Sequence, residues 1–252
     1  MGAALRDLIA RSRAGQLISA TTFTDADWQD QDLQGATFQD CVFADANFSS
    51  TDFSAARFTA CRFPQSRFTN TNLREASFTN CSFTDPENIG ARFTGADLRD
   101  AHFTSCDLAM SRFIRCDAFA IVFDACNLLG ASFEKSDFSH SYGRGKITTR
   151  ASFNACNLGL ADLAGLRLPG ATLSGSRLRD ANLETTDLSG ADLRDCDLYG
   201  AALDQAKLDR ADLRGADITG LNLLHLASYR GMMISPAQQH FILLALGVSV
   251  ED

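Results

Sequence analysis

The feature that most constrains the fold of this chain is an apolar residue at every fifth position. Between residues 190 and 223 the series runs through Leu193, Leu198 and Leu203 and continues in steps of five. An α-helix repeats about every 3.6 residues and a β-strand about every 2, so a period of five suits neither element. The pattern instead indicates a backbone that turns a corner every five residues and directs one large side chain towards a common axis each time.

This period extends over most of the chain. Counting in fives from residue 23 to residue 223 visits 41 positions, and 35 of them are Phe or Leu. Only two of the 19 Phe residues, Phe119 and Phe241, lie outside the series. A chain of 252 residues could form one or two domains, and the shared frame favours one elongated domain.

A second position, two residues before each large one, is restricted mostly to small side chains. Its members between residues 36 and 81 are Ala36, Cys41, Ala46, Thr51, Ala56, Cys61, Ser66, Thr71, Ala76 and Cys81. One large and one small residue in every five would face inward and three would face outward, which describes a square coil with four sides of five residues. Stacked at the spacing of neighbouring β-strands, about 4.8 Å, these coils would make about ten turns and a rod of roughly 50 Å.

The repeats "ADLRG", "ADLRD", "ANLET" and "CDLYG" resemble the pentapeptide-repeat family, whose pattern is A(D/N)LXX. The resemblance covers roughly residues 21–223 and implies an all-β solenoid, a right-handed quadrilateral β-helix. We expect a short capping α-helix within residues 1–20. We expect a C-terminal α-helix and tail, used for dimerisation, within residues 224–252.

Charge and hydropathy exclude several classes of protein. The net charge of −8 argues against nonspecific binding to nucleic acid, so we expect no direct contact with it. A membrane span needs ~18 apolar residues. The longest apolar stretch here, "FILLALGVSV", is too short. The N-terminal sequence also lacks the pattern of a secretory signal.

The eight cysteines all occupy the small inward position. They are Cys41, Cys61, Cys81, Cys106, Cys116, Cys126, Cys156 and Cys196. This placement predicts buried, free thiols that act as compact apolar residues. No CxxC pair or Cys/His cluster has zinc spacing, and we expect no metal and no cofactor. Buried free thiols favour a reducing compartment, so we expect a cytoplasmic protein.

Residues 84–91, "TDPENIGA", interrupt the five-residue series at Asn88. Pro, Asn and Gly in close succession indicate a turn or loop. Because Phe83 and Phe93 are ten residues apart, the frame is kept, and we expect a bulged side of the coil rather than a full excursion. The candidate contact residues of this smaller loop are Asp85, Pro86, Glu87 and Asn88.

Residues 139–151, "SHSYGRGKITTRA", lose two successive large positions and predict a projecting loop. An irregular segment on a rigid scaffold is a usual place for function, although a solvated loop that the solenoid merely tolerates is the alternative. It is not a phosphate-binding loop, because Lys146 is followed by Ile147 rather than Ser or Thr. The candidate partner-binding residues are Tyr142, Arg144, Lys146, Ile147, Thr148, Thr149 and Arg150.

The N-terminal segment predicts a short helix. Leu5, Leu8 and Ile9 have helical spacing, and Gly15 is a stop signal. Such a helix would cover the open edge of the first coil, which would otherwise be free to pair with other strands.

The C-terminal segment "SPAQQHFILLALG" predicts a second helix, with Ser235 as N-cap, Pro236 at the first helical position and Gly247 after its end. It carries more apolar side chains than one coil end can cover. We therefore expect a homodimer through this helix, although capping alone is the alternative. The expected dimer residues are Phe241, Ile242, Leu244 and Leu246.

Three stretches are similar to the Qnr and MfpA type of pentapeptide-repeat protein, which protects topoisomerases. "FTSCDLAMSRF", residues 103–113, resembles the run F-x-S-C-D-L-S-M-A-D-F; "ITTR", residues 147–150, resembles the larger Qnr loop; "ALGV", residues 245–248, resembles the end of the Qnr dimer helix. The resemblance implies binding to DNA gyrase or topoisomerase IV and protection from poisons such as quinolones or natural toxins. It also implies that MfpA-like members imitate duplex DNA, whereas Qnr-like members use loops to loosen a drug-trapped complex.

The charge distribution allows partial DNA mimicry. Residues 21–60 carry a net charge of −6 and residues 181–220 carry −5, whereas residues 61–150 are nearly neutral. Two chains joined at their C-terminal helices would place acidic segments at the centre of a rod of about 100 Å. The alternative is that Asp recurs because the repeat uses it in turns. The expected acidic face consists of Asp192, Asp195, Asp197, Asp204, Asp209, Asp212 and Asp217.

No motif predicts an enzyme. The four histidines lie far apart in the sequence, and no nucleophile elbow, dinucleotide fingerprint or metal signature is present. The leading hypothesis is a cytoplasmic, dimeric protein that binds and protects a type II topoisomerase. The alternative is a generic interaction scaffold or effector without a topoisomerase target, because fold alone does not fix function.

Overall fold

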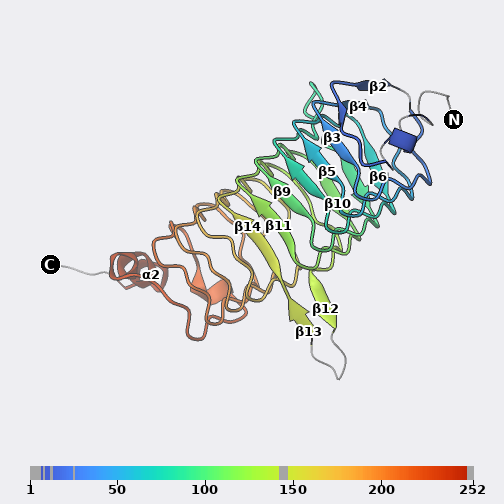
Figure 1. Ribbon diagram of the computed structural model, residues 1–252. Coiled ribbons are helices and arrows are strands. Elements are labelled where there is room, and N and C mark those ends of the chain that lie inside the picture. The colour runs from blue at the N-terminus through green and yellow to red at the C-terminus, as the bar shows by residue number, and fades with distance from the viewer. Residues whose placement is uncertain (1–6, 8, 12–13, 25, 142–146, 249–252) are drawn as a thin grey trace.

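The computed structural model describes residues 7, 9–11, 14–24, 26–141 and 147–248 of the chain. They form an elongated rod with the two ends of the chain at opposite tips (Figure 1). The rod is a quadrilateral β-helix solenoid with a small helix at its C-terminal tip, as the five-residue period predicted.

Each side of a coil pairs in parallel with the same side of the next coil, so that Arg57 lies between Thr37 and Ser77. Four such columns of pairing run along the rod. In one column the strands join into a seven-stranded sheet. Its strands are β1 (Ile18–Ser19), β3 (Thr37–Gln39), β5 (Arg57–Thr59), β7 (Ser77–Thr79), β9 (His102–Thr104), β11 (Ile121–Asp124) and β14 (Ala151–Asn154).

The remaining strands form smaller sheets. A three-stranded sheet contains β6 (Arg67–Thr69), β8 (Arg92–Thr94) and β10 (Arg112–Ile114), and a two-stranded one contains β2 (Thr22–Thr24) and β4 (Val42–Ala44). An antiparallel pair consists of β12 (Ser139–Ser141) and β13 (Ile147–Thr149). Elsewhere the columns continue as single bridges between successive coils, such as Asp192 to Asp212.

The large residues of the five-residue series fill the axis of the rod. Phe58, Phe78 and Phe103 stack face to face, with ring centroids 4.7 and 4.8 Å apart. Beyond residue 158 the same positions are occupied mainly by buried leucines. Burial of one Phe or Leu side chain contributes about 1.5–3 kcal/mol, so the repeated stack supplies the main favourable term for folding.

The corners of the coil depend on the second residue after a large one, which adopts a positive φ in most of the described coils. Asp45 and Asn70 have φ of 52° and 51°, and Gly95 has 62°. Asp, Asn and Gly enter this left-handed region more readily than other residues. Met110 and Leu160 adopt it as well, both at 57°, although the left-handed conformation costs other residues about 1–2 kcal/mol.

All eight cysteines are buried and free, as their spacing predicted. The Cys126 thiol donates to the Phe103 carbonyl of the preceding coil at 3.2 Å. Burial raises the pKa of the Cys116 thiol to about 11, so that this group stays protonated at neutral pH. These thiols act as inward packing groups with weak hydrogen bonds to the backbone.

The register of pairing between successive coils shows how many extra residues each interruption contains. Asn72 pairs with Asp97, 25 residues away, so the expectation of a mere bulge at residues 84–91 is wrong. Five extra residues leave the coil there, and an antiparallel bridge from Thr84 to Gly90 closes the excursion. At the second interruption Asn127 pairs with Asn157, 30 residues away, so ten extra residues leave the coil.

Both ends of the rod carry short helical segments. Residues 9–11 and Asp7 are helical, and Ile9 is buried against the core; Leu5 and Leu8 of the predicted helix lie outside the described residues. The C-terminal segment contains two 3₁₀ turns, η1 (Leu223–His225) and η2 (Pro236–Gln238), and the helix α2 (Gln239–Ala245).

Candidate interaction surfaces

The antiparallel pair β12–β13 projects from one corner of the rod (Figure 1). Its base is fixed on both sides. Ser139 donates from its backbone N and its Oγ to Oδ1 of Asp137, at 2.9 and 2.7 Å. The Arg150 N–H donates to the Phe138 carbonyl at 3.2 Å. The hairpin therefore leaves the rod in a defined direction.

The predicted loop residues divide between this base and the remainder of the loop. Ile147, Thr148 and Thr149 form β13, and Thr149 pairs with Ser139. Thr148 and Thr149 are half-buried and Arg150 is exposed. The other predicted residues, Tyr142, Arg144 and Lys146, lie outside the described residues. Sequence reasoning did not single out His140, whose ring lies 5.2 Å from that of Phe119 and packs the hairpin against the coil.

The smaller loop is organised by Asp85. Its Oδ1 accepts from the backbone N–H groups of Ile89 at 2.7 Å and Glu87 at 3.0 Å, and its Oδ2 accepts from Gln65 Nε2 at 2.9 Å. Asp85 is buried, so it holds the loop together rather than offering a contact. Pro86, Glu87 and Asn88 are exposed.

The seven aspartates of the expected acidic face do not share one face. Asp192 and Asp212 stack in one column of the rod, and Asp197 and Asp217 stack in the next. Asp195 follows Asp192 at a corner with φ of 57°. The other two, Asp204 and Asp209, contact His225 and Ser228 respectively. The negative charge therefore surrounds this part of the rod instead of lying along one side.

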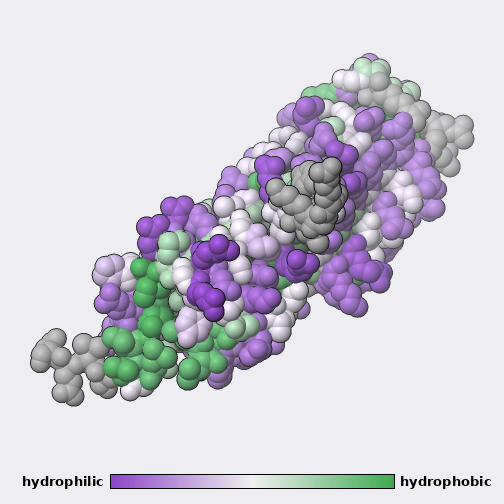
Figure 2. Space-filling view, turned by 90° about the horizontal axis from the view of Figure 1, so that it is seen from below, coloured by the Kyte–Doolittle hydropathy of each residue, from purple (hydrophilic) through white to green (hydrophobic). Residues whose placement is uncertain are grey.

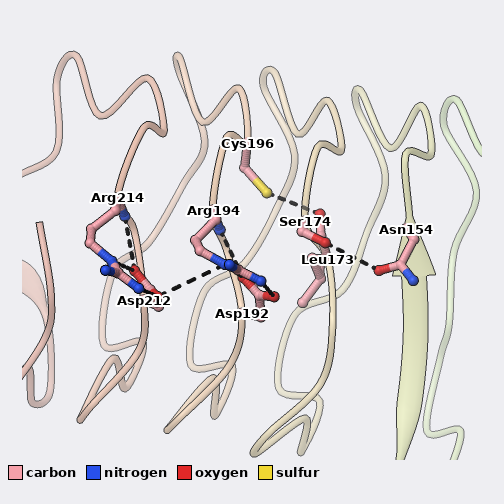
Figure 3. A network of polar contacts seen from close by, with 8 residues as sticks. All are labelled: Asn154, Leu173, Ser174, Asp192, Arg194, Cys196, Asp212 and Arg214. Atoms are coloured by element: carbon pink, nitrogen blue, oxygen red, sulfur yellow. Dashed lines mark hydrogen bonds and ion pairs between the residues drawn. The ribbon is translucent and has the colours of Figure 1, made fainter. Parts of the chain in front are cut away.

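Arginines partly neutralise these carboxylates (Figure 3). Arg194 donates to both oxygens of Asp192 at 2.8 and 2.7 Å, and Arg214 donates to both oxygens of Asp212 at 2.9 and 2.6 Å. These bonds lower the pKa of Asp192 and of Asp212. The two arginine side chains are about half exposed, so solvent screens both pairs and each contributes little to stability. Each arginine also reduces the net acidity of the column.

The C-terminal helix leaves an apolar surface uncovered. Phe241, Leu244 and Leu246 are exposed, whereas Ile242 packs against the core. Hydrophobic residues gather at this tip of the rod in Figure 2. The helical segment opens at Pro236 as predicted, but as the 3₁₀ turn η2, and α2 follows from Gln239. The Ser235 N–H and Oγ both donate to Gln238 Oε1, at 2.6 and 2.8 Å.

Gln238 is a structural residue that sequence reasoning missed. It is buried, and its Nε2 donates to the carbonyls of Leu213 at 2.7 Å and Ala216 at 2.8 Å. These carbonyls belong to the last part of the β-helix, so Gln238 closes the C-terminal end of the coil. The spacing Ser-x-x-Gln at the start of a predicted helix is a capping-box signal that could have identified it.

A row of exposed apolar residues was also missed. Ile89, Met110, Leu129 and Leu160 lie near one edge of the rod, at or next to the corner positions of successive coils. Met110 N–H donates to the Leu129 carbonyl, which shows that their coils are adjacent there. The signal was available, because corner positions are polar or small in most other coils.

Within the described part of the chain, no group of three His, Cys, Asp or Glu side chains is placed to hold a metal ion. No helix among the described residues is long and apolar enough to cross a membrane. The surface features of the described residues are loops, charged columns and an apolar tip.

Comparison with known proteins identifies the repeat. A model described as a pentapeptide repeat region matches residues 31–100, and one described as pentapeptide repeats matches residues 89–117, 151–195 and 196–226. Among curated protein sequences, none matches the chain.

Solved structures with the same fold include QnrB1, a plasmid-mediated fluoroquinolone resistance protein. A trypsin-treated form is 22% identical with a TM-score of 0.62, covering 86% of this chain and 100% of that one. The full-length form is also 22% identical, with a TM-score of 0.59 and coverages of 84% and 100%. The repeat models, the four-sided coil and these shared folds together show that the chain belongs to the pentapeptide-repeat family.

Proposed function

We propose that this protein binds a type II topoisomerase, DNA gyrase or topoisomerase IV, and protects it from poisons such as quinolones or natural toxins. It acts as a cytoplasmic homodimer and has no enzymatic activity of its own. The observation that carries the proposal is the match to QnrB1, a fluoroquinolone resistance protein, over that protein's whole length. The projecting hairpin supplies a surface through which such a protein could contact its target.

Two kinds of contact support this proposal. The hairpin β12–β13 extends from the rod and has a fixed base, so a partner would meet this base in a set position. The acidic columns near the C-terminal tip, such as Asp197 with Asp217, would lie near the centre of a dimer joined at α2. Duplex DNA carries one charge about every 1.7 Å, so this rod imitates DNA in patches only.

The test is a gyrase supercoiling assay with and without a quinolone. Deletion of residues 140–149 removes the ten residues by which this coil exceeds its neighbours. Ser139 would then join Arg150, and the pairing step would return to 20 residues. We expect the deletion variant to keep its thermal stability and to lose protection of gyrase.

The matched control is deletion of residues 85–89, which likewise restores a uniform coil at the smaller loop. This control separates the effect of the hairpin on gyrase protection from the effect of removing any loop. Full protection by the variant without residues 140–149 would remove the hairpin from the mechanism. If the intact protein neither affects supercoiling nor captures gyrase, a scaffold with another target would be favoured instead.

A further inference from the structure

Three arginines stack in register on the sheet formed by β6, β8 and β10, which lies in the N-terminal half of the rod (Figure 1). Arg67 pairs with Arg92, and Arg92 pairs with Arg112. All three side chains are exposed. We call this column the arginine ladder. Uncharged residues border it, because Asn47 precedes Arg67 and Ser132 follows Arg112 in the same column.

The ladder lacks the acidic partners that other arginines of the rod have. Arg99, Arg194 and Arg214 each form ion pairs with aspartates of their own or the neighbouring coil. Among the described residues, no ion pair or side-chain hydrogen bond engages the three ladder arginines. Neighbouring strands are about 4.8 Å apart, and like charges directly opposite each other in a sheet are destabilising. The folded rod thus holds three adjacent guanidinium groups against their mutual repulsion.

Apolar residues lie along the edge of the ladder. Ile89 lies just before Arg92 in the sequence, and Met110 lies just before Arg112. Their side chains are 54% and 50% exposed. A Cβ on Gly90 would come within 2.3 Å of the Met110 backbone, so the smaller loop lies directly on the coil that carries Met110. Met110 also adopts the left-handed conformation at φ 57°. This edge therefore combines positive charge with exposed apolar surface, a composition typical of protein interfaces.

We propose that the arginine ladder and its apolar edge bind an acidic, extended segment of a protein partner. Carboxylates along one strand-like segment would meet the guanidinium groups, and an adjacent apolar side chain would cover Ile89 and Met110. This inference goes beyond topoisomerase protection, because it specifies the chemistry of the bound segment and does not depend on the identity of the partner.

Charge elsewhere on the rod favours a narrow peptide over a nucleic acid. The adjoining column of the same coils contains the carboxylates of Asp52, Asp97, Asp117 and Asp137. A duplex is wider than one side of the coil and would approach these carboxylates as well as the arginines. Ile89 and Met110, which are exposed beside the arginines, offer nothing to a phosphate backbone.

The experiment measures binding of a fluorescein-labelled decaglutamate peptide by fluorescence anisotropy at low and high salt. We expect the full-length protein to bind the peptide at low salt and to release it as salt screens the charges. The triple variant Arg67→Gln, Arg92→Gln, Arg112→Gln should bind about tenfold more weakly. Its melting temperature at low salt should match or exceed that of the unchanged protein, because the repulsion is removed.

The matched control is Arg167→Gln, Arg177→Gln, Arg210→Gln, which removes the same charge from exposed positions outside the ladder. This variant should keep its affinity for decaglutamate. Equal weakening by both triple variants, or no binding by the unchanged protein at low salt, would overturn the proposal. The proposal would also be overturned if the same three arginines bound a labelled DNA duplex more tightly than the peptide.

Discussion

At the scale of single residues, the Asp85 carboxylate shows how one side chain organises a loop. Hydrogen bonds from the Ile89 N–H, from Gln65 and from the Glu87 N–H favour its charged form and lower its pKa. A carboxylate with a lowered pKa stabilises the folded state above the pKa of the unfolded chain. That contribution is lost as pH falls through the lower, folded-state pKa.

The substitution Asp85→Ala should loosen the smaller loop at neutral pH. We expect a lower melting temperature and faster cleavage after Glu87 by a glutamate-specific protease, because the two loop N–H groups lose their acceptor. The difference in melting temperature should shrink as pH falls below 3.8, the ordinary value for the carboxyl group. Asp85→Asn, which keeps an acceptor oxygen, should give an intermediate effect. A difference that does not depend on pH would contradict the role given to the charge.

At the scale of elements, stability comes from contacts between one coil and the next. The ring of Phe78 lies between those of Phe58 and Phe103 at interplanar angles of 3° and 6°. Each coil contacts only its neighbours, as in other solenoids, so stability is approximately a sum of coil and interface terms. A defect in one coil is therefore felt mainly by the two coils beside it.

Replacing Phe78 with alanine should destabilise the rod by about 3–5 kcal/mol, because both neighbouring rings lose a contact face and a cavity remains. Phe78→Leu is the matched control, since leucine occupies the same position in the C-terminal coils, and its effect should be under about 1.5 kcal/mol. Denaturant unfolding of both variants measures the difference. Equal losses would show that the cavity does not determine the effect.

The sequence was sufficient to predict the coil, its core and the inward cysteines, because a period of five is compatible with one arrangement of corners. It could not fix the register across the interruptions. Five extra residues at the smaller loop leave the five-residue frame unchanged, so a bulge and an excursion look alike in sequence. The same shift brings Arg92, rather than residue 87, beside Arg67, which hid the arginine ladder. The acidic residues were counted along the chain, whereas a step of 20 distributes them over several faces.

At the scale of the whole molecule, the two tips of the rod differ. At the N-terminal tip Ile9 is buried among core residues, whereas at the C-terminal tip Phe241 and Leu244 remain exposed. Association of two copies through the C-terminal tip would cover this surface and place the rods end to end. The dimer would then be about twice as long as one chain and hardly wider.

The double substitution Phe241→Asp, Leu244→Asp should convert the proposed dimer into a monomer. We expect the mass measured by light scattering to fall by half and the maximum dimension measured by small-angle X-ray scattering to fall with it. Leu160→Asp is the control, because Leu160 is 64% exposed but lies outside this tip, and its dimer should persist. A monomeric unchanged protein would show that α2 serves only to cap the coil.

The Gln238 amide has a consequence for the length of the molecule. A parallel β-helix has no internal reason to stop, because the carbonyls of any terminal coil are a template for further strands. Gln238 Nε2 donates to the Ala216 carbonyl, which is at such a pairing position, and to the Leu213 carbonyl beside it. One uncharged side chain thereby takes a place that the backbone N–H of a further strand would need.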